Sequence, residues 1–275
     1  MNILESIIYG IISGISEFIP VSSLGHQSLM KIIFGATSPE PLRDIFVHSA
    51  MLCAVLVSCG TYLERLKREM NSNSGRRRKT RSTDRLAEQE LRLIRTAAFP
   101  MLLGMLAYFA FAKFGSSLIL LAVFFVMNGI ILYIPEHLAH ANRNAGQMSS
   151  FDALLIGLCG ALSAFPGISR IGGSLSCAIA KGADQVQAYN WVLILSIPAI
   201  VLLLIFDVIG IFFTGFGVIT FISFLGYLLS ALFAFVSAVV GIYFMRVLTK
   251  RSGITFIAFY SWGAAFLSFL LYMFA

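Results

Sequence analysis

Two short polar segments in an otherwise apolar chain carry the side chains best suited to chemistry. The first is EFIPVSSLGH, from Glu17 to His26, and the second is AFPGISRIGGS, at positions 164–174. Arg170 in the second segment offers a planar fork of donors that suits phosphate. Backbone amides freed at 22–25 and 167–173 are suited to an anion nest at helix starts. The two segments together therefore predict a site for a phosphate-bearing ligand.

The side chains of the first segment add the groups needed for bond cleavage. His26 is able to act as a base, an acid or a nucleophile near neutral pH. Ser23 lies three positions earlier and is a second candidate nucleophile. Glu17 is suited to orient the histidine, take a proton or hold Mg²⁺ or Ca²⁺. The set predicts cleavage of a phosphate ester or anhydride, while helix capping by Ser22 and Ser23 and a structural role for His26 remain alternatives.

Composition places these segments in a membrane protein. The 275 residues are 58% hydrophobic and only 12% charged, whereas soluble domains carry about 25% charged residues. Apolar runs of about 20 residues predict membrane spans, and their continuous rather than alternating pattern favours helices over a β-barrel. Ionisable groups inside such a fold are costly and are functional candidates by default.

The apolar runs predict both full spans and interrupted ones. Segments 3–19 and 151–164 each end at a proline-containing break, and the pieces that follow, 27–34 and 175–180, are too short to cross a bilayer. This pattern predicts two re-entrant hairpins, which are tolerated only when buried in protein or lining a cavity. The expected full spans are 45–62, 96–112, 118–135, 191–209, 216–247 (one tilted helix or two shorter ones) and 254–274.

The two breaks also resemble each other. Pro20 and Pro166 lie 146 positions apart, and aligning them places Ser23 on Ser169. Paired broken helices at half-chain spacing are typical of internal repeats built around one site. We therefore predict a single integral-membrane domain, 1–275, with repeat halves of about 1–115 and 116–275, inverted if an odd number of spans separates them.

Basic residues are concentrated in one stretch. Eleven of the twenty Lys and Arg lie between positions 62 and 95. Beside a span this pattern indicates a cytoplasmic loop, at about 63–93, rather than a nucleic-acid site. The four cysteines have no CxxC spacing, which argues against a metal cluster.

Four further residues stand out within the apolar segments. His48 is a lone polar residue in a span, and both packing and site lining are open to it. Trp191 and Tyr260, with Trp262, are predicted to anchor the helices at the membrane interface.

The motifs resemble those of a known family. SGISEFIPVSSLGH, from Ser13 to His26, resembles the first signature of the undecaprenyl-diphosphatases, the bacitracin-resistance phosphatases of bacterial membranes, and FPGISRIGG resembles the second. DIFVHSAMLCAVLV and NWVLILSIPAI resemble the spans that follow each signature. The resemblance extends over nearly the whole chain.

This resemblance implies an all-α fold of transmembrane helices with two inverted repeats and two re-entrant hairpins. It implies hydrolysis of undecaprenyl diphosphate to undecaprenyl phosphate and inorganic phosphate, which recycles the lipid carrier for peptidoglycan and gives bacitracin resistance. It also implies a divalent cation, Mg²⁺ or Ca²⁺, and a site facing the outer side of the bacterial cytoplasmic (inner) membrane. The expected partners are the lipid substrate and the bilayer, with no nucleic acid, and with monomer and homodimer both open.

Residue by residue, the resemblance assigns roles to the two breaks. Glu17 matches the second carboxylate of the acidic motif and a metal ligand, and Ser13 stands where the family has the first. Whether Ser23 or His26 attacks is open, and Ile171 replaces a usual Ser. The expected catalytic residues are Glu17, Ser23, His26 and Arg170, and the expected substrate-binding residues are Ser13, Ser22, Gly25, Gly167, Ser169 and Gly172.

Two other functions compete with hydrolysis. A transporter or flippase of polyprenyl phosphate would use the same broken helices and the same Arg170, and the loss of a carboxylate at Ser13 favours it slightly. An inactive relative that binds lipid phosphate is the other alternative. Retention of both Ser23 and His26 favours the enzyme, because binding alone needs neither a nucleophile nor a base.

Overall fold

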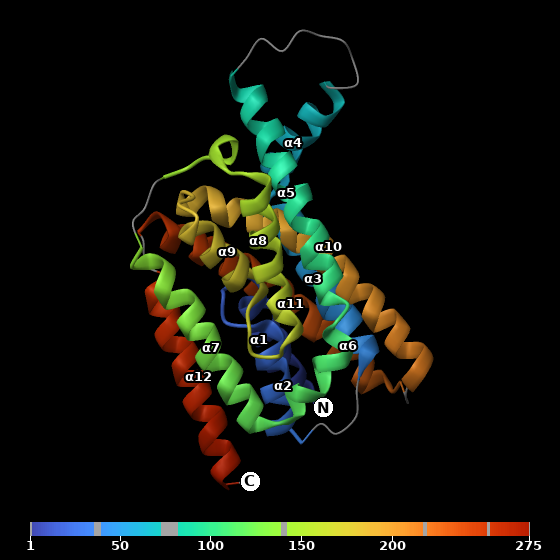
Figure 1. Ribbon diagram of the computed structural model, residues 1–275. Coiled ribbons are helices and arrows are strands. Elements are labelled where there is room, and N and C mark those ends of the chain that lie inside the picture. Colours follow the sequence, from blue (N-terminus) through green and yellow to red (C-terminus); the bar gives the residue numbers. More distant parts are fainter. Residues whose placement is uncertain are drawn as a thin grey trace.

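The computed structural model describes residues 2–35, 40–72, 82–138, 142–216, 219–251 and 254–274, and this part of the chain is helical with no strand. Figure 1 shows a bundle with both chain ends at its lower side. The elements are α1 (Ile3–Phe18), α2 (Ser23–Ile33), α3 (Pro41–Ser58), α4 (Gly60–Ser72), α5 (Ser82–Met105), α6 (Tyr108–Phe111), η1 (Ala112–Ser116), α7 (Leu118–Glu136), η2 (Ala145–Gln147), α8 (Ser150–Ala161), η3 (Leu162–Ala164), α9 (Arg170–Ala180), α10 (Gln185–Thr214), α11 (Phe221–Lys250) and α12 (Thr255–Phe274).

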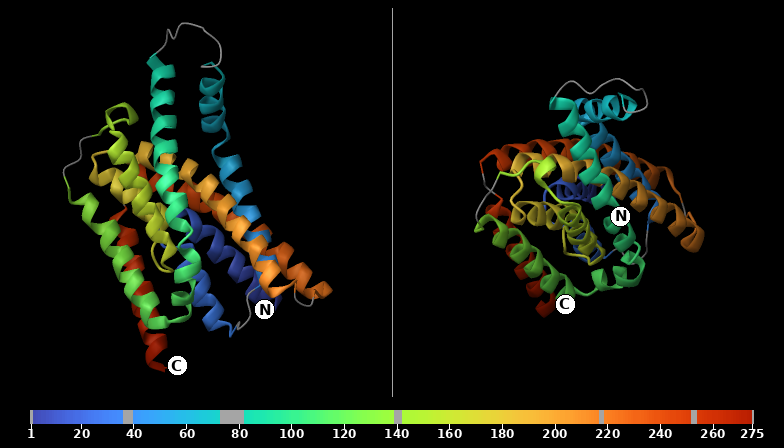
Figure 2. Two further views of the ribbon diagram at one scale, coloured as in Figure 1. Left: turned by 45° about the vertical axis from the view of Figure 1, so that its right-hand side comes forward. Right: turned by 45° about the horizontal axis from the view of Figure 1, so that its top comes forward.

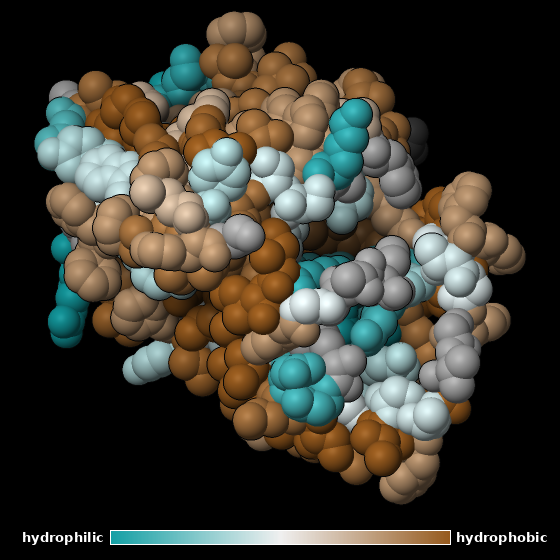
Figure 3. Space-filling view, turned by 90° about the horizontal axis from the view of Figure 1, so that it is seen from below, coloured by the Kyte–Doolittle hydropathy of each residue, from teal (hydrophilic) through white to brown (hydrophobic). Residues whose placement is uncertain are grey.

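Several helices meet the length and hydropathy that a membrane crossing requires. In the described residues there are five of them: Pro41–Ser58, Leu118–Pro135, Gln185–Thr214, Phe221–Lys250 and Thr255–Phe274. Seen from below, much of the surface is hydrophobic, and hydrophilic residues gather around a hollow (Figure 3). The prediction of an all-α, multi-pass membrane protein is confirmed.

Two of the predicted spans can be compared directly with the helices. The stretch 216–247 lies mainly in one helix, α11. The predicted span 96–112 is wrong as a continuous helix, because α5 ends at Met105 and i→i+3 bonds from Leu106 and Ala107 form a turn before α6. Hydropathy continues through such a turn, so composition alone does not reveal it.

The basic stretch is helical at both of its ends. Helix α4 covers 60–72 and α5 begins at Ser82, and together they project from the top of the bundle (Figures 1 and 2). The most basic part, 73–81, lies outside the described residues. Trp191 is buried at 1% exposure, so its prediction as an interface anchor is wrong.

Two helix–break–helix units approach each other from opposite ends of the bundle. Helices α1 and α2 occupy its lower part, and α8 and α9 its upper part, in the views of Figures 1 and 2. A Cβ added at Gly25, in the first turn of α2, would lie 2.8 Å from the backbone of Gly167. The two breaks therefore touch. That they are re-entrant, and that the halves are inverted repeats, stay predictions.

Local sequence explains where each break falls. Pro20 lacks a backbone N–H, and Ile19 before it is extended, so α1 cannot continue. Helix α2 restarts after Ser22, whose side chain accepts from the Gly25 amide, and α9 restarts after Ser169, which accepts from Gly172. Capping by Ser22 is thus confirmed.

The two caps correct the alignment of the repeats. Ser22 and Ser169 occupy equivalent positions and lie 147 residues apart. The second break therefore has one more residue between its proline and its cap than the first. Ser23 corresponds to Arg170, and the predicted match of Ser23 with Ser169 is wrong by one position.

Helix α1 is held against α11 by small residues. A Cβ at Gly10 or Gly14 would overlap the carbonyl oxygen of Ser230 or Ala234. Such close backbone approach is the usual use of small residues between membrane helices. This close packing fixes the position of α1, the helix that carries Glu17.

Candidate active site

Arg170 and Glu17 form an ion pair where the two breaks meet. Arg170 is the first residue of α9, and Glu17 is in the last turn of α1, 153 positions earlier. Their side chains are only 8% and 6% exposed. A buried charge requires such a partner. Glu17 and Arg170, which sequence reasoning assigned to one site, lie in contact, and their roles in a site stay predictions.

Ser22 ties the two breaks together. Its hydroxyl oxygen accepts from the amide of Gly25 at 3.2 Å and from the amide of Gly167 at 3.1 Å. Ser22 itself has a φ of 71°, and Gly167 a φ of 112°, both in the region that favours glycine. The strained loop conformation thus serves to aim backbone amides at one oxygen, as an anion nest would require.

Asn128 of α7 fastens the same junction from a third direction. Its Nδ2 donates to the Pro20 carbonyl and to the Ser261 hydroxyl, both at 3.0 Å, and its Oδ1 accepts from the Ser169 amide at 2.8 Å. The side chain is fully buried. Sequence reasoning missed Asn128, although a lone Asn within the apolar span 118–135 was an available signal.

A small polar cavity lies beside the ion pair. Its volume is about 20 Å³, which holds about one water molecule. The polar side chains that line the cavity are Ser16, Glu17, Ser22, Ser23, Ser163, Ser169 and Arg170.

Ser23 lines this cavity with a hydroxyl that is not paired to a histidine. Its oxygen accepts from Gln27 Nε2 at 3.2 Å, and it lies 3.5 Å from the carbonyl oxygen of Ser13. The hydroxyl of Ser13 is buried and has no hydrogen-bond partner among the described residues. Ser13 lies one helical turn before Glu17 and therefore on the same face of α1.

His26 has two partners, and neither is Ser23. Its Nδ1 lies 2.8 Å from the Ser22 carbonyl oxygen, and its Nε2 lies 2.9 Å from the Tyr260 hydroxyl. The Tyr260 ring stacks on the imidazole with centroids 5.7 Å apart. Tyr260, predicted only as an interface anchor, thus contacts a predicted site residue. The two residues lie 234 positions apart in the chain, so sequence spacing could not predict this contact.

His48 belongs to a separate buried pair. Its Nδ1 is 2.6 Å from Asp207 Oδ2 on α10. Nearby on α3, Asp44 accepts from the Tyr9 hydroxyl at 2.8 Å and pairs with Lys31 at 3.3 Å. The cavity beside Arg170 is not lined by His48, so the two open alternatives for this residue resolve in favour of a paired position in the helix packing.

The oxygen donors beside the cavity suit a divalent cation only if the bound substrate supplies further oxygens. Among the described residues, no three His, Cys, Asp or Glu side chains converge. Glu17 is the carboxylate that lines the cavity, and the unpartnered Ser13 hydroxyl is a neutral oxygen on the same helix face. Mg²⁺ commonly uses one or two carboxylates plus substrate phosphate oxygens, so these residues fit a cation that arrives with a diphosphate.

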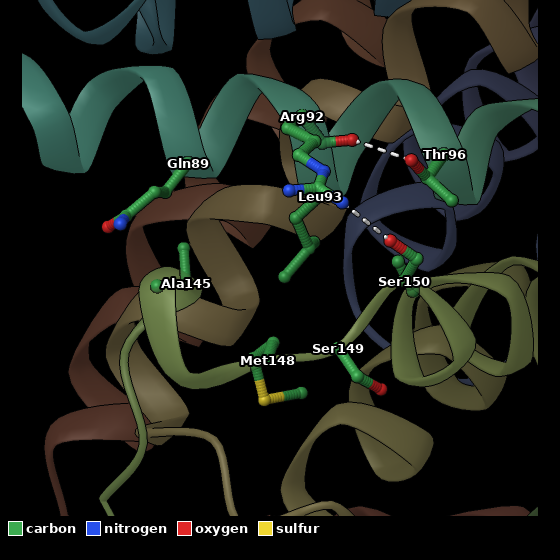
Figure 4. A pocket seen from close by; sticks show the side chains of 10 residues that line it. Gln89, Arg92, Leu93, Thr96, Ala145, Met148, Ser149 and Ser150 are labelled. Carbon is green, nitrogen blue, oxygen red and sulfur yellow. Dashed lines mark hydrogen bonds between the residues drawn. The ribbon is translucent and has the colours of Figure 1, made fainter.

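A larger hollow, of about 230 Å³, lies near the other end of α8 (Figure 4). It is bordered by Gln89 and Arg92 of α5 and by Ser149 and Ser150. Arg92 donates to the Ser150 hydroxyl at 3.0 Å. No residue of the predicted site lines it, so size alone does not identify the functional cavity here.

Comparison with known proteins shows the family of the chain. The family model described as bacitracin resistance protein BacA matches residues 6–267. The undecaprenyl-diphosphatase of Desulforapulum autotrophicum is 26% identical over 98% of both chains, and that of Treponema denticola is 28% identical over 94% of both. The undecaprenyl-diphosphatase of Desulfatibacillum aliphaticivorans is 31% identical over 76% of this chain and 78% of its own.

Proposed function

This chain belongs to the bacitracin resistance protein BacA family, and from that membership and the site we propose that it hydrolyses undecaprenyl diphosphate to undecaprenyl phosphate and inorganic phosphate. The observation that carries the proposal is the Arg170–Glu17 pair, which is buried at the junction of two breaks beside Ser23. A guanidinium on the first residue of a helix suits a phosphoryl group. The product would return to cell-wall synthesis, and continued turnover would give bacitracin resistance.

The terminal phosphate replaces the Glu17 carboxylate as the partner of Arg170. Arg170 neutralises the charge that develops on the phosphoryl oxygens. Ser23, which lines the cavity, attacks the terminal phosphorus, and the bond to the bridging oxygen breaks to release undecaprenyl phosphate. His26 takes the Ser23 proton. Water then hydrolyses the phosphoserine to regenerate Ser23 and release phosphate.

A divalent cation bound with the diphosphate would be held by Glu17, with Ser13 as a neutral oxygen donor. It would supply charge neutralisation on the phosphate oxygens. Because one carboxylate is replaced by Ser13, we propose weaker cation binding than a pair of carboxylates would give.

The site is proposed to face the outside of the cytoplasmic membrane. The basic helices α4 and α5 project from one end of the bundle, and both termini lie at the other (Figure 1). Cytoplasmic segments are enriched in Lys and Arg, which assigns the projecting end to the cytoplasm. The hollow surrounded by hydrophilic residues in Figure 3 is then on the outer side, where α1 and α2 lie.

The test is phosphate release from undecaprenyl diphosphate by the purified protein in detergent, with Mg²⁺ and with a chelator. Arg170→Ala is expected to lose about a hundredfold or more in turnover, because a preorganised charge partner of the transferred phosphoryl group is removed. The matched control is Arg251→Ala, which removes an exposed guanidinium at the end of α11. The chelator is expected to lower the rate.

A wild-type protein that binds the lipid yet releases no phosphate would contradict hydrolysis. In that event, movement of a labelled polyprenyl phosphate between leaflets of a vesicle would support the transport alternative. Binding without either activity would support a lipid-phosphate-binding relative.

A further inference from the structure

An apolar groove lies on the lipid-facing side of His26. It has a volume of about 220 Å³ and runs between α1, α11 and α12. Its rim is open to the hydrophobic outer surface, since Phe256 is 70% exposed and Tyr260 is 50% exposed. The residues that matter here are Ile12, Ile19, Phe244, Phe256, His26 and Tyr260, all of which line it.

The groove adjoins the polar cavity. Ser16 lines both, so the two lie next to each other. One side of Ser16 therefore presents Arg170, Glu17 and Ser23, and the other presents aliphatic and aromatic carbon. A ligand with a strongly anionic head and an apolar chain matches both surfaces at once, whereas free phosphate or a soluble phosphate ester matches only the first.

The protonation of His26 follows from its partners. A backbone carbonyl only accepts hydrogen bonds, so the Nδ1 that faces the Ser22 carbonyl carries the hydrogen. In the neutral imidazole Nε2 is then the basic nitrogen, and it accepts from the Tyr260 hydroxyl. The nitrogen that would act as the base is thus turned to the groove and is engaged by Tyr260.

We propose that this groove binds the first isoprene units of the lipid substrate and that Tyr260 is a positioning residue that links chain binding to catalysis. An isoprenoid chain in the groove displaces the half-exposed Tyr260 ring from the imidazole. Nε2 is then free to take a proton from Ser23. The inference rests on the proposed hydrolysis, and it adds that a substrate without a chain leaves His26 engaged.

The test compares undecaprenyl diphosphate with methyl diphosphate, which carries no isoprene unit. In the wild type, kcat is expected to be higher for the long chain. Tyr260→Phe keeps the ring and removes the hydroxyl, so kcat for the short substrate is expected to rise several-fold toward the long-chain value. Ile12→Trp fills the groove, and KM for the long chain is expected to rise about tenfold because buried methylene contacts are lost. Its KM for the short substrate stays unchanged.

Ile11→Trp is the matched control, because Ile11 is the neighbouring exposed residue of α1 and does not line the groove. The proposal is overturned if Tyr260→Phe lowers kcat for both substrates equally. It is also overturned if Ile12→Trp raises KM for both substrates by the same factor. A wild type that turns over both substrates with equal kcat also overturns it.

A measurement without turnover separates this inference from the proposed function. A prenyl diphosphate with a photoreactive group on its first isoprene unit is expected to crosslink to the groove-lining residues of α1, α11 and α12. Crosslinking there without any phosphate release would contradict hydrolysis and support the groove. Crosslinking only elsewhere would overturn the groove while leaving hydrolysis intact.

Discussion

At the scale of single residues, the central feature is the buried ion pair between Arg170 and Glu17. The guanidinium of Arg170 contacts Glu17 in a cavity with room for about one water molecule. In the proposed function, the terminal phosphate would replace this carboxylate as the partner of Arg170.

Removing one member of this pair is expected to cost more stability than removing both. Arg170→Gln leaves the Glu17 carboxylate buried without a partner, which typically costs about 3–5 kcal/mol. The double variant Glu17→Gln/Arg170→Gln carries no buried charge, so its melting temperature is expected to recover, while phosphate release does not. Thermal unfolding in detergent and phosphate release from the same samples check this. Equal melting temperatures for the single and double variants would show that the pair has no structural role.

Asn128 is a second residue whose loss is expected to reach the site. Asn128→Ala leaves the Pro20 carbonyl and the Ser169 amide without their partner, and each unsatisfied buried group costs about 1–3 kcal/mol. We expect a lower melting temperature and reduced phosphate release. Ser261→Ala removes only one of the three contacts of Asn128 and is expected to have a smaller effect. A variant as stable and active as the wild type would exclude Asn128 as a clamp of the two breaks.

At the scale of elements, function depends on how closely the starts of α2 and α9 approach. Gly25→Ala places a Cβ 2.8 Å from both the Gly167 backbone and the Phe125 ring. The two breaks must then move apart, so we expect a large loss of phosphate release. Gly263→Ala on α12 meets nothing within 4 Å and serves as the control. Full activity in Gly25→Ala would mean that this contact does not position the site.

Sequence reasoning could predict the elements that carry the chemistry but not their partners. The sequence could predict the breaks at Pro20 and Pro166, the need for a partner for Glu17 and Arg170, and the helix caps. Each of these depends on the chemistry of one residue and its neighbours along the chain. Tyr260 and Asn128 were missed because their contacts join helices far apart in the chain. The turn after Met105 was missed because apolar composition continues across it.

At the scale of the whole molecule, the distribution of basic residues indicates how the protein is oriented across the membrane. Helices α4 and α5 carry the basic residues at one end, and both termini lie at the other (Figure 2). Of the helices that lie between the two broken units in the chain, α3 and α7 meet the length and hydropathy of a membrane span among the described residues, and α5 does not. That the two halves are inverted stays a prediction.

This orientation can be measured with single cysteines in a variant whose four native cysteines are replaced. Met273→Cys lies near the C-terminus, and Lys67→Cys lies on α4, and both positions are exposed. A membrane-impermeant thiol reagent added to intact spheroplasts is expected to label position 273 and spare position 67, because basic segments stay in the cytoplasm. Permeabilised cells, in which both label, are the control. Labelling of position 67 alone would reverse the orientation.

The distance along the chain between Glu17 and Arg170 has a consequence for biogenesis. Arg170 is synthesised 153 positions after Glu17, so everything between them is made before the pair exists. A nascent chain that has passed only its first half therefore holds an acidic side chain with no counterion at the end of α1. The Glu17–Arg170 contact can therefore form only after α9 has been synthesised. A chain truncated before that point would present an uncompensated charge to the bilayer, which is the kind of defect that membrane proteases recognise.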